Sequence, residues 1–333
     1  MNNTLNSYIK GMGYYVPDRV IDNEYFTNFM ETSDQWIRER TGIEERRFAN
    51  KNQGPSDIAI PAVEMALKNS ELIIEDIDFI IFATSTPDYY IPGSGCLIQD
   101  KMNFKNIGTL DIRCQCSGFI YALSIADQYI KTQTYKNILI VASEVQSTAM
   151  DLSNEGRNTA IIFADGAAAA VISGTNKNKG LLSTHLHTEG KYAKELWVEA
   201  PSSKKQPRLD KSILDQKAHF LYMNGREVFR HAIKRFPEVI YEALDYNNLS
   251  IKDIDLLIPH QANLRISQAI QKKMNLKDNQ IVSNIHKYGN TTAASVPIAL
   301  CESIIDSKLK KGDILVLAAF GSGFSWGSAI LKW

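Results

Sequence analysis

Residues 76–81, DIDFII, recur later in the chain as DIDLLI at residues 253–258. The two stretches are 253 − 76 = 177 residues apart. A second pair, NILIVA at residues 137–142 and DILVLA at residues 313–318, is offset by 313 − 137 = 176 residues. Short apolar strands recur by chance, but two chance matches would not share nearly one offset, so the sequence indicates two duplicated halves.

Short apolar runs alternate along the chain with longer stretches of helical pattern, such as residues 58–67. Such runs are typical of strands that are buried on both faces under helices. We therefore expect an α/β fold in layers, with a mixed sheet in each half. The Asn- and Lys-rich segment 174–180 is typical of a connection and divides the chain into residues 1–175 and 176–333. Residues 188–217, which contain two prolines and several lysines, indicate a long excursion or lid.

The composition argues against several classes of protein. The 333 residues include 37 basic and 37 acidic ones, so no net charge would draw the chain to nucleic acid or to an anionic membrane. The chain shows neither a signal-peptide pattern nor an apolar stretch of membrane-spanning length, so we expect a cytoplasmic protein. Its four cysteines form no CxxC pair, which argues against a disulfide scaffold. His185 and His187 have no evident third ligand, so we expect no metal site.

Cys116 lies in RCQCSGF, between an apolar run at residues 107–112 and a helix-like run at residues 118–123. A cysteine at this strand-to-helix turn would face the positive end of the helix dipole and free backbone N–H groups. Both stabilise a thiolate and favour nucleophilic attack on a thioester. Taken alone, however, a free cysteine is more often a small buried thiol.

His260 and Asn290 also follow the ends of predicted elements. His260 comes after the strand-like run 254–258 in IPHQAN, and Asn290 comes after a Gly289 turn in KYGNTTAAS. A lone His or Asn in such a place is usually a cap or a hydrogen-bonding residue. Together with Cys116, however, they supply the nucleophile and the two donors that acyl-thioester chemistry needs.

At these residues the chain resembles the class III β-ketoacyl-acyl-carrier-protein synthases, which are thiolase-fold condensing enzymes. The resemblance covers nearly the whole chain, and the motifs PHQAN, YGNT and GFSWG are highly specific. It implies two halves with mixed five-stranded sheets layered between helices in the order αβαβα. The further motifs are TSDQWIRERTGIEERRF at 32–48, GRNTAIIFADGAAAAVI at 156–172, MNGREVF at 223–229 and AFGSGFSWGSAIL at 319–331.

The resemblance implies an acyltransferase that performs a decarboxylative condensation without a cofactor. An acyl group moves from acyl-coenzyme A to Cys116, and malonyl-carrier protein then loses carbon dioxide and attacks the acyl-enzyme. His260 and Asn290 would stabilise the enolate, by roughly 3–4 kcal/mol per well-placed donor. The backbone N–H groups of Cys116 and Ser322 would form a second oxyanion hole. A thiolase would carry a second cysteine as base, and a hydroxymethylglutaryl-type synthase a glutamate at position 290; neither is evident.

The same resemblance assigns two binding surfaces. Trp36 would stack on the adenine of coenzyme A, and two arginines would meet its phosphates. The positions matching the coenzyme A entrance are Trp36, Arg40, Arg157, Phe229 and Asn263. A basic patch would meet the acidic carrier protein. Its members would be Arg230, Lys234, Arg265, Lys272 and Lys273.

The family forms homodimers, in which a loop reaches into the partner's acyl tunnel. Residues 87–95 resemble that loop, with Ile91 at its tip. Because Ile91 is smaller than phenylalanine, it would leave room for a branched or longer primer.

Departures from the family pattern leave the acyl primer open. Gln115 precedes the nucleophile where a small residue is common, Arg226 stands where some members have asparagine, and FADGAAAA replaces a glycine-richer segment. The donor could be coenzyme A or a carrier protein. The chain could start fatty-acid synthesis, or it could be a specialised condensing enzyme or acyltransferase of secondary metabolism with a non-acetyl primer. The intact Cys116, His260 and Asn290 argue against a third class, a non-catalytic partner.

Overall fold

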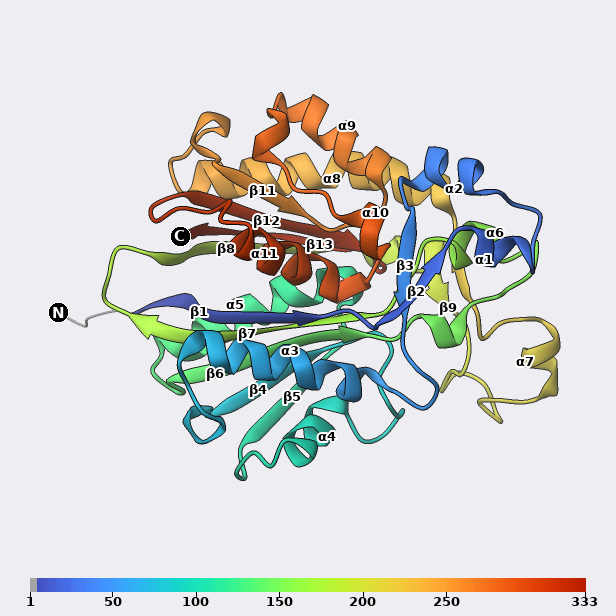
Figure 1. Cartoon of the computed structure of the whole chain (residues 1–333), viewed down its shortest axis with the longest axis horizontal. Coiled ribbons are helices and arrows are strands. Elements are labelled where there is room, and N and C mark those ends of the chain that lie inside the picture. The colour runs from blue at the N-terminus through green and yellow to red at the C-terminus, as the bar shows by residue number, and fades with distance from the viewer. Residues whose placement is uncertain (1–4) are drawn as a thin grey trace.

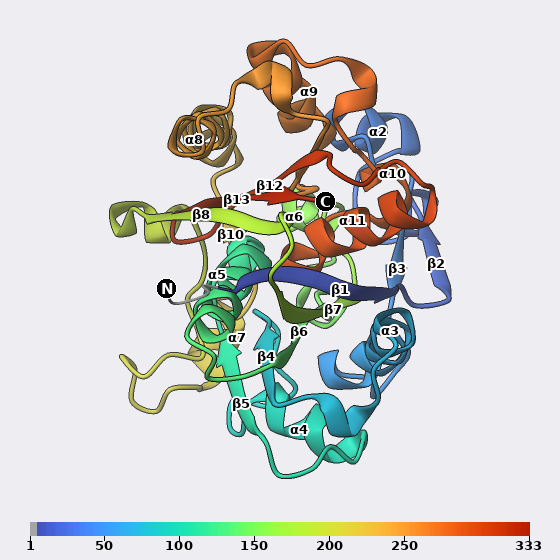
Figure 2. The same ribbon diagram turned by 90° about the vertical axis from the view of Figure 1, so that its left-hand side faces the viewer.

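Two β-sheets lie between three layers of helices in the computed structural model, which describes residues 5–333 (Figures 1 and 2). The outer layer on the first sheet is formed by α3 (Pro55–Ser70) and α4 (Ser94–Lys101). The outer layer on the second sheet is formed by α8 (Gly225–Tyr246) and α9 (Leu264–Met274). Between the sheets lie α5 (Gly118–Lys131) and α11 (Ser295–Ile305). The predicted αβαβα order is therefore confirmed.

The first sheet is mixed and has five strands in the order β1-β7-β6-β4-β5. The central strand β6 runs parallel to β4 and antiparallel to β7, which in turn pairs with β1. The strands are β1 (Asn6–Tyr15), β4 (Phe79–Ala83), β5 (Gly108–Ile112), β6 (Asn137–Glu144) and β7 (Gly166–Thr175). The alanine run of β7 is buried on both faces, which lets α3 approach the sheet closely.

The second sheet, within the described residues, has four strands in the order β11-β12-β13-β8. The prediction of a fifth strand in this sheet is therefore wrong. Its strands are β8 (Gly180–Thr188), β11 (Leu256–Pro259), β12 (Ile314–Gly321) and β13 (Ser325–Lys332). Beside β11, Ile281 makes only an isolated bridge to Leu257. The pairing stops there because the next ladder donor to the carbonyl of Val282 would be residue 259, a proline without a backbone N–H. The Gln261 side chain donates to that carbonyl instead and accepts from the backbone N–H of Asn284. A ladder would need those backbone groups.

The repeated stretches take corresponding places in the two sheets. In the first sheet DIDFII leads into β4 and NILIVA opens β6, and these strands pair in parallel. In the second sheet DIDLLI leads into β11 and DILVLA falls in β12, and these strands also pair in parallel. The chain passes from the first sheet to the second between β7 and β8, and the division at residues 175 and 176 stays a prediction.

Smaller elements gather at one end of the molecule, on the right in Figure 1. The segment predicted as an excursion contains a 3-10 helix, the short strand β9 (Leu196–Val198) paired with β10 (Leu221–Met223), and α7 (Lys211–Asp215), which stands apart from the layers. The remaining elements at this end are β2 (Arg19–Asp22), β3 (Glu45–Phe48), α1 (Glu24–Thr27), α2 (Asp34–Thr41) and α6 (Arg157–Ala160). Last, α10 (Ile285–Tyr288) links the isolated bridge to the segment before α11.

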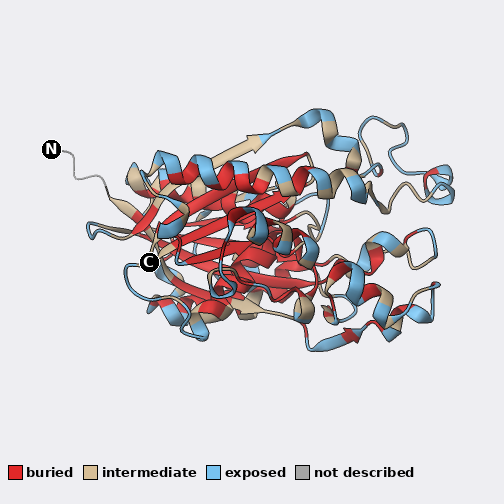
Figure 3. Ribbon diagram, turned by 90° about the horizontal axis from the view of Figure 1, so that it is seen from above, coloured by how far each residue is buried: buried red, intermediate tan, exposed pale blue. Residues whose placement is uncertain are grey.

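The buried residues follow the sheets and the two central helices, whereas the outer helices are exposed on the face turned to solvent (Figure 3). This pattern is what apolar burial between layers requires. None of the helices between residues 5 and 333 combines the length and the apolarity needed to cross a membrane.

Candidate active site

Cys116 lies in a single 3-10 turn, Gln115–Ser117, that joins the end of β5 to the start of α5. Its side chain is buried against the end of β12. A Cβ atom added to Gly321 would come within 2.9 Å of the Cys116 sulfur, so only glycine permits this approach of the backbone. The Ser117 hydroxyl fixes the turn by donating to the carbonyl of Ser325 at 3.0 Å.

Burial, as the main cause, and the carboxylate of Glu144, as the second, raise the pKa of the Cys116 thiol to about 12. The backbone N–H groups of Cys116 and Ser322 act in the opposite direction, because both hydrogen-bond to the sulfur. The expectation of a lowered thiol pKa at the helix N-terminus is therefore wrong for this structure. Loss of hydration disfavours the thiolate by more than the nearby dipoles stabilise it.

His260 follows Pro259 at the end of β11 and is buried. Its Nδ1 lies 2.6 Å from the Ser295 hydroxyl, which also accepts from the backbone N–H of Gln261 at 3.3 Å. Burial lowers the pKa of His260 to about 3, so the imidazole is neutral at pH 7. A hydroxyl can donate or accept, so Ser295 supports the ring with the proton on either nitrogen.

Asn290 follows α10 and the left-handed Gly289, whose φ is 61°. The element before it is thus a short helix, where the sequence indicated only a turn. The Asn290 Oδ1 accepts from the backbone N–H of Thr292 at 2.9 Å. This contact fixes the amide so that its Nδ2 group remains as a donor.

A cavity of about 500 Å³ brings the three predicted catalytic residues together. Its wall also contains four of the five positions predicted for coenzyme A, from α2, α8 and the start of α9. The shared lining is Cys116, His260, Asn290, Trp36, Arg40, Phe229 and Asn263. A second cavity of about 1280 Å³ reaches Cys116 from the other side and is lined by Gln115, Ser322 and residues 85–90. The nucleophile therefore lies where two cavities meet.

Arg157 does not line the smaller cavity but stacks on Trp36. Its guanidinium lies 4.6 Å from the centroid of the Trp36 ring, and that of Arg40 lies 4.5 Å from the same ring. Asn263 caps α9 and donates from Nδ2 to the carbonyl of Arg40 at 2.9 Å. These contacts join α2 to α9 and place two guanidinium groups against the Trp36 ring, which lines the cavity.

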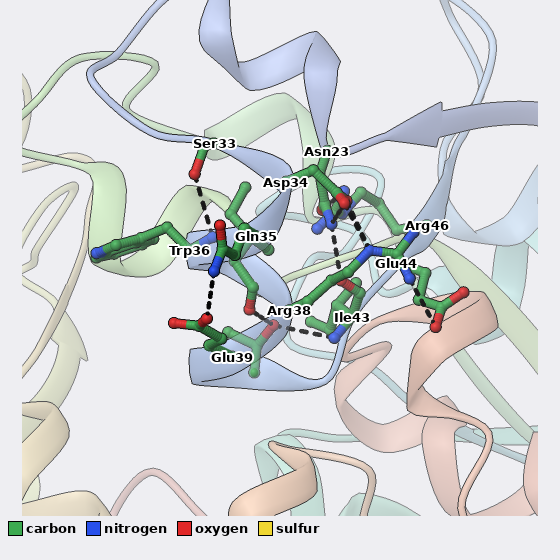
Figure 4. A network of polar contacts seen from close by, with 12 residues as sticks. Asn23, Ser33, Asp34, Gln35, Trp36, Arg38, Glu39, Ile43, Glu44 and Arg46 are labelled. Atoms are coloured by element: carbon green, nitrogen blue, oxygen red, sulfur yellow. Dashed lines mark hydrogen bonds and ion pairs between the residues drawn. The ribbon is translucent and has the colours of Figure 1, made fainter.

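The motif at residues 32–48 builds the support for Trp36 (Figure 4). Ser33 caps α2 by accepting from the backbone N–H of Trp36 at 3.1 Å. Arg38 pairs with Asp34 on the same helix and with Glu44 beyond its end. Next to this network, the buried Arg46 donates to the side-chain oxygen of Asn23 at 2.9 Å. Burial lowers the pKa of the Arg46 guanidinium to about 9. The Trp36 side chain points away from this network (Figure 4).

All five residues predicted for the carrier-protein patch are exposed on α8 and α9, which pack against each other in the outer layer (Figure 2). Glu227 pairs with Arg230, and Glu238 lies 4.0 Å from Lys234. Arg265 lies over the Phe229 ring, 5.9 Å from its centroid, and connects the patch to the cavity wall. Lys272 and Lys273 stand in the last turn of α9.

Two further predictions concern residues outside this site. Ile91 is 80% exposed, at the tip of the loop between β4 and α4, and does not line either cavity. His185 and His187 both contact Glu242, at 3.2 Å and 2.6 Å. In the part of the chain that the structure describes, no group of three or more His, Cys, Asp and Glu side chains is placed to hold a metal.

Sequence reasoning missed residues that orient the predicted ones. Ser295 ends the KYGNTTAAS motif and contacts His260, and Glu144 lies beside Cys116. Both gave a signal, since each is a polar residue next to a strongly apolar run, VPIAL or ILIVAS. Buried polar groups in such places need partners, which marks them for closer attention.

Two family models match the chain. Residues 110–190 match 3-Oxoacyl-[acyl-carrier-protein (ACP)] synthase III, and residues 244–333 match its C-terminal counterpart. A beta-ketoacyl-[acyl-carrier-protein] synthase III from Fusobacterium nucleatum subsp. nucleatum is 44% identical over 325 residues, 98% of each chain.

Two solved structures of synthases are also similar to this chain. The crystal structure of 3-oxoacyl-[acyl-carrier-protein] synthase III from Aquifex aeolicus VF5 matches with a TM-score of 0.90 at 37% identity, covering 98% of this chain and 100% of that one. The priming beta-ketosynthase from the R1128 polyketide biosynthetic pathway matches with a TM-score of 0.90 at 28% identity, covering 98% and 96%.

Proposed function

This chain belongs to the β-ketoacyl-acyl-carrier-protein synthase III family, and we propose that it condenses an acyl-coenzyme A primer with malonyl-acyl-carrier protein to start fatty-acid synthesis. The observation that carries the proposal is the cavity of about 500 Å³. This cavity is lined by the buried thiol of Cys116, the neutral imidazole of His260 and the oriented amide of Asn290. Trp36 and Arg40 line the same cavity. Acyl-coenzyme A is a substrate here, and the reaction needs no cofactor.

In the first stage, Cys116 takes the acyl group. Its sulfur attacks the thioester carbonyl, the bond from that carbonyl to the coenzyme A sulfur breaks, and the thiol proton leaves with coenzyme A. The backbone N–H groups of Cys116 and Ser322, which lie beside the sulfur, would stabilise the tetrahedral oxyanion. Because burial favours the neutral thiol, the thiolate forms only during the attack.

In the second stage, malonyl-carrier protein replaces coenzyme A. Its carboxylate leaves as carbon dioxide, and the electron pair moves onto the thioester as an enolate. His260 and Asn290 would each donate a hydrogen bond to the enolate oxygen. The enolate carbon then attacks the acyl-Cys116 carbonyl, the carbon–sulfur bond breaks, and the β-ketoacyl product leaves. The sulfur departs as a thiolate and takes one proton from solvent, which regenerates the thiol. Neutral imidazole suits this role, since the ring nitrogen opposite Ser295 carries the proton when Ser295 donates to Nδ1.

The binding surfaces extend the proposal to partners. Trp36, Arg40 and Arg157 would hold the adenine and the phosphates of coenzyme A, with Phe229 and Asn263 on the remaining wall. The exposed basic residues of α8 and α9 would meet the acidic carrier protein.

The expected cytoplasmic location and homodimer remain part of the proposal. In such a dimer, the exposed Ile91 would enter the partner's acyl tunnel. The cavity of about 1280 Å³ would hold the acyl chain, and Gln115 lies on its wall next to the nucleophile.

A second candidate function is the priming step of a specialised pathway with a non-acetyl primer. Its support is the structural match to the R1128 priming ketosynthase, although that protein is less similar in sequence than the synthases named above. Turnover with a panel of acyl-coenzyme A donors and malonyl-carrier protein separates the two. A preference for acetyl or short branched primers supports fatty-acid initiation, and a preference for an unusual acyl group supports the specialised role.

A further inference from the structure

Glu144 is a fully buried carboxylate at the end of β6 that the proposed reaction does not use. Besides Nε2 of Gln146, at 3.3 Å, its donors come from two separate segments. Ser85, after β4, donates from its backbone N–H at 3.1 Å and from its hydroxyl at 2.7 Å, and Thr86 donates from its hydroxyl at 2.9 Å. The backbone N–H of Ala293, in the segment after Asn290, donates to the same carboxylate. Glu144 thus ties the end of β4 to the Asn290 segment.

Gln146 makes a second tie to the same segment. Its Nε2 donates to the hydroxyl of Thr292 at 3.0 Å and to the hydroxyl of Ser85 at 3.0 Å. Thr292 has a φ of 50°, a left-handed conformation that β-branched residues disfavour. Such a residue costs roughly 1–3 kcal/mol and persists only where its surroundings hold it. Gln146 and Glu144 are the side chains that bind this turn from the first half of the chain.

The turn in question is the one that orients Asn290. The backbone N–H of Thr292 donates to the Asn290 Oδ1 at 2.9 Å, which leaves the Nδ2 group as the donor to the substrate. The turn also packs closely against Gly118, two residues after the nucleophile. A Cβ atom built on Gly118 would lie only 3.3 Å from the Cβ of Ala293. A shift of the turn would therefore move the Asn290 amide relative to Cys116.

We propose that Glu144 and Gln146 are positioning residues for decarboxylation, because they hold the Thr292–Ala293 turn that aims the Asn290 amide. The inference rests on the proposed function and deepens it. It predicts that the two half-reactions respond differently, since acyl transfer to Cys116 uses backbone N–H groups and not Asn290. It also has an electrostatic consequence. Burial raises the pKa of Glu144 to about 7, so above pH 7 most of the carboxylate is ionised and raises the pKa of the Cys116 thiol. Its removal should then make that thiol more reactive.

The test measures the two stages separately in Glu144→Gln and Gln146→Leu. Cys116 acylation by acyl-coenzyme A is followed by quenched-flow intact mass, and carbon dioxide release from malonyl-carrier protein is followed on the pre-acylated enzyme. We expect decarboxylation to fall about tenfold or more in both variants, with acylation retained. In Glu144→Gln, alkylation of Cys116 by iodoacetamide at pH 7.5 should become several-fold faster.

Glu302→Gln is the matched control, because Glu302 is likewise a carboxylate that accepts from side chains, here those of Asn284 and Tyr288, but it has no hydrogen bond to the Thr292–Ala293 turn. It should change the melting temperature without separating the half-reactions. Equal losses in both stages, or unchanged decarboxylation, would overturn the positioning role. If Glu144→Gln does not fold, Gln146→Leu decides, since it keeps the carboxylate with its shorter hydrogen bonds to Ser85 and Thr86 and removes only the 3.3 Å contact from Gln146. A wild-type enzyme that performs neither stage would instead overturn the proposed function itself.

Discussion

The hydroxyl oxygen of Ser295 lies 2.6 Å from Nδ1 of His260, and both residues are buried. His260 directly follows β11 and Ser295 opens α11, and these two elements contact each other. The contact fixes the plane of the imidazole, and when Ser295 donates to Nδ1 the proton lies on the other ring nitrogen. Ser295 therefore acts through His260, whose neutral state follows from its burial.

Ser295→Ala should slow malonyl decarboxylation by about fivefold, because a loosely held imidazole is a poorer donor and one oriented hydrogen bond is worth about 1 kcal/mol. Acylation of Cys116 should change less. Ser303→Ala is the control, since Ser303 lies on the same helix and donates only to the carbonyl of Ala299. Steady-state kinetics of both variants test this, and equal effects of the two substitutions would contradict the orienting role.

The stability of the protein should depend on His260 in acid. The pKa of His260 is lowered to about 3 in the folded state, against roughly 6.5 in an unfolded chain. This depressed pKa gives stability that is complete above pH 6.5 and is lost as the pH falls toward 3. The loss attributable to His260 should reach about 3 kcal/mol between pH 7 and pH 4.

Urea unfolding of wild type and His260→Gln across this pH range measures that difference. The variant should lose less stability on acidification than wild type. Cys116→Ala serves as a control in the same site, because a thiol whose pKa is raised stays neutral throughout the range. Parallel curves for wild type and His260→Gln would show that His260 is not held neutral by burial.

The two arginines of α2 should differ in their effect on coenzyme A. Arg40 lines the cavity and stacks on Trp36, whereas Arg38 pairs with Asp34 and Glu44 outside it. Arg40→Ala should raise the KM for acyl-coenzyme A about tenfold, the effect of one charge-assisted phosphate contact. Arg38→Ala should leave that KM nearly unchanged. The assignment of this entrance fails if both substitutions act alike, or if the KM for malonyl-carrier protein rises instead.

The basic surface of α8 and α9 should govern the carrier-protein step. Arg265→Glu with Lys273→Glu should raise the KM for malonyl-carrier protein about tenfold or more and flatten its dependence on salt, because the charges steer association. The KM for acyl-coenzyme A should change less. Lys68→Glu, on α3 in the opposite outer layer, should have no such effect. An unchanged salt dependence in the double variant would exclude this patch.

The repeated stretches were enough to predict the layered fold, because strands buried on both faces leave a continuous apolar run in the sequence. The missing fifth strand of the second sheet had no such signal. Pro259 has no backbone N–H to continue the ladder, and the Gln261 side chain takes up backbone groups of Val282 and Asn284 instead. A glutamine beside the candidate His260 does not indicate which backbone groups it will bind after the chain has folded.

The candidate active site, too, could be predicted from the sequence only in part. Cys116, His260 and Asn290 could be singled out because each follows an apolar run or a turn and belongs to a specific motif. The thiol pKa could not be predicted, because the helix N-terminus is visible in the sequence while the depth of burial and the nearby Glu144 are not. Likewise, only the folded chain shows that Arg157 reaches Trp36.

The most direct test of the condensing reaction is the intact mass of the enzyme after incubation with acyl-coenzyme A, followed by a chase with malonyl-carrier protein. An adduct of one acyl group should form on wild type and be absent from Cys116→Ala. It should then disappear as β-ketoacyl-carrier protein and carbon dioxide appear. An adduct that survives the malonyl chase, or one that forms equally on Cys116→Ala, would contradict the account.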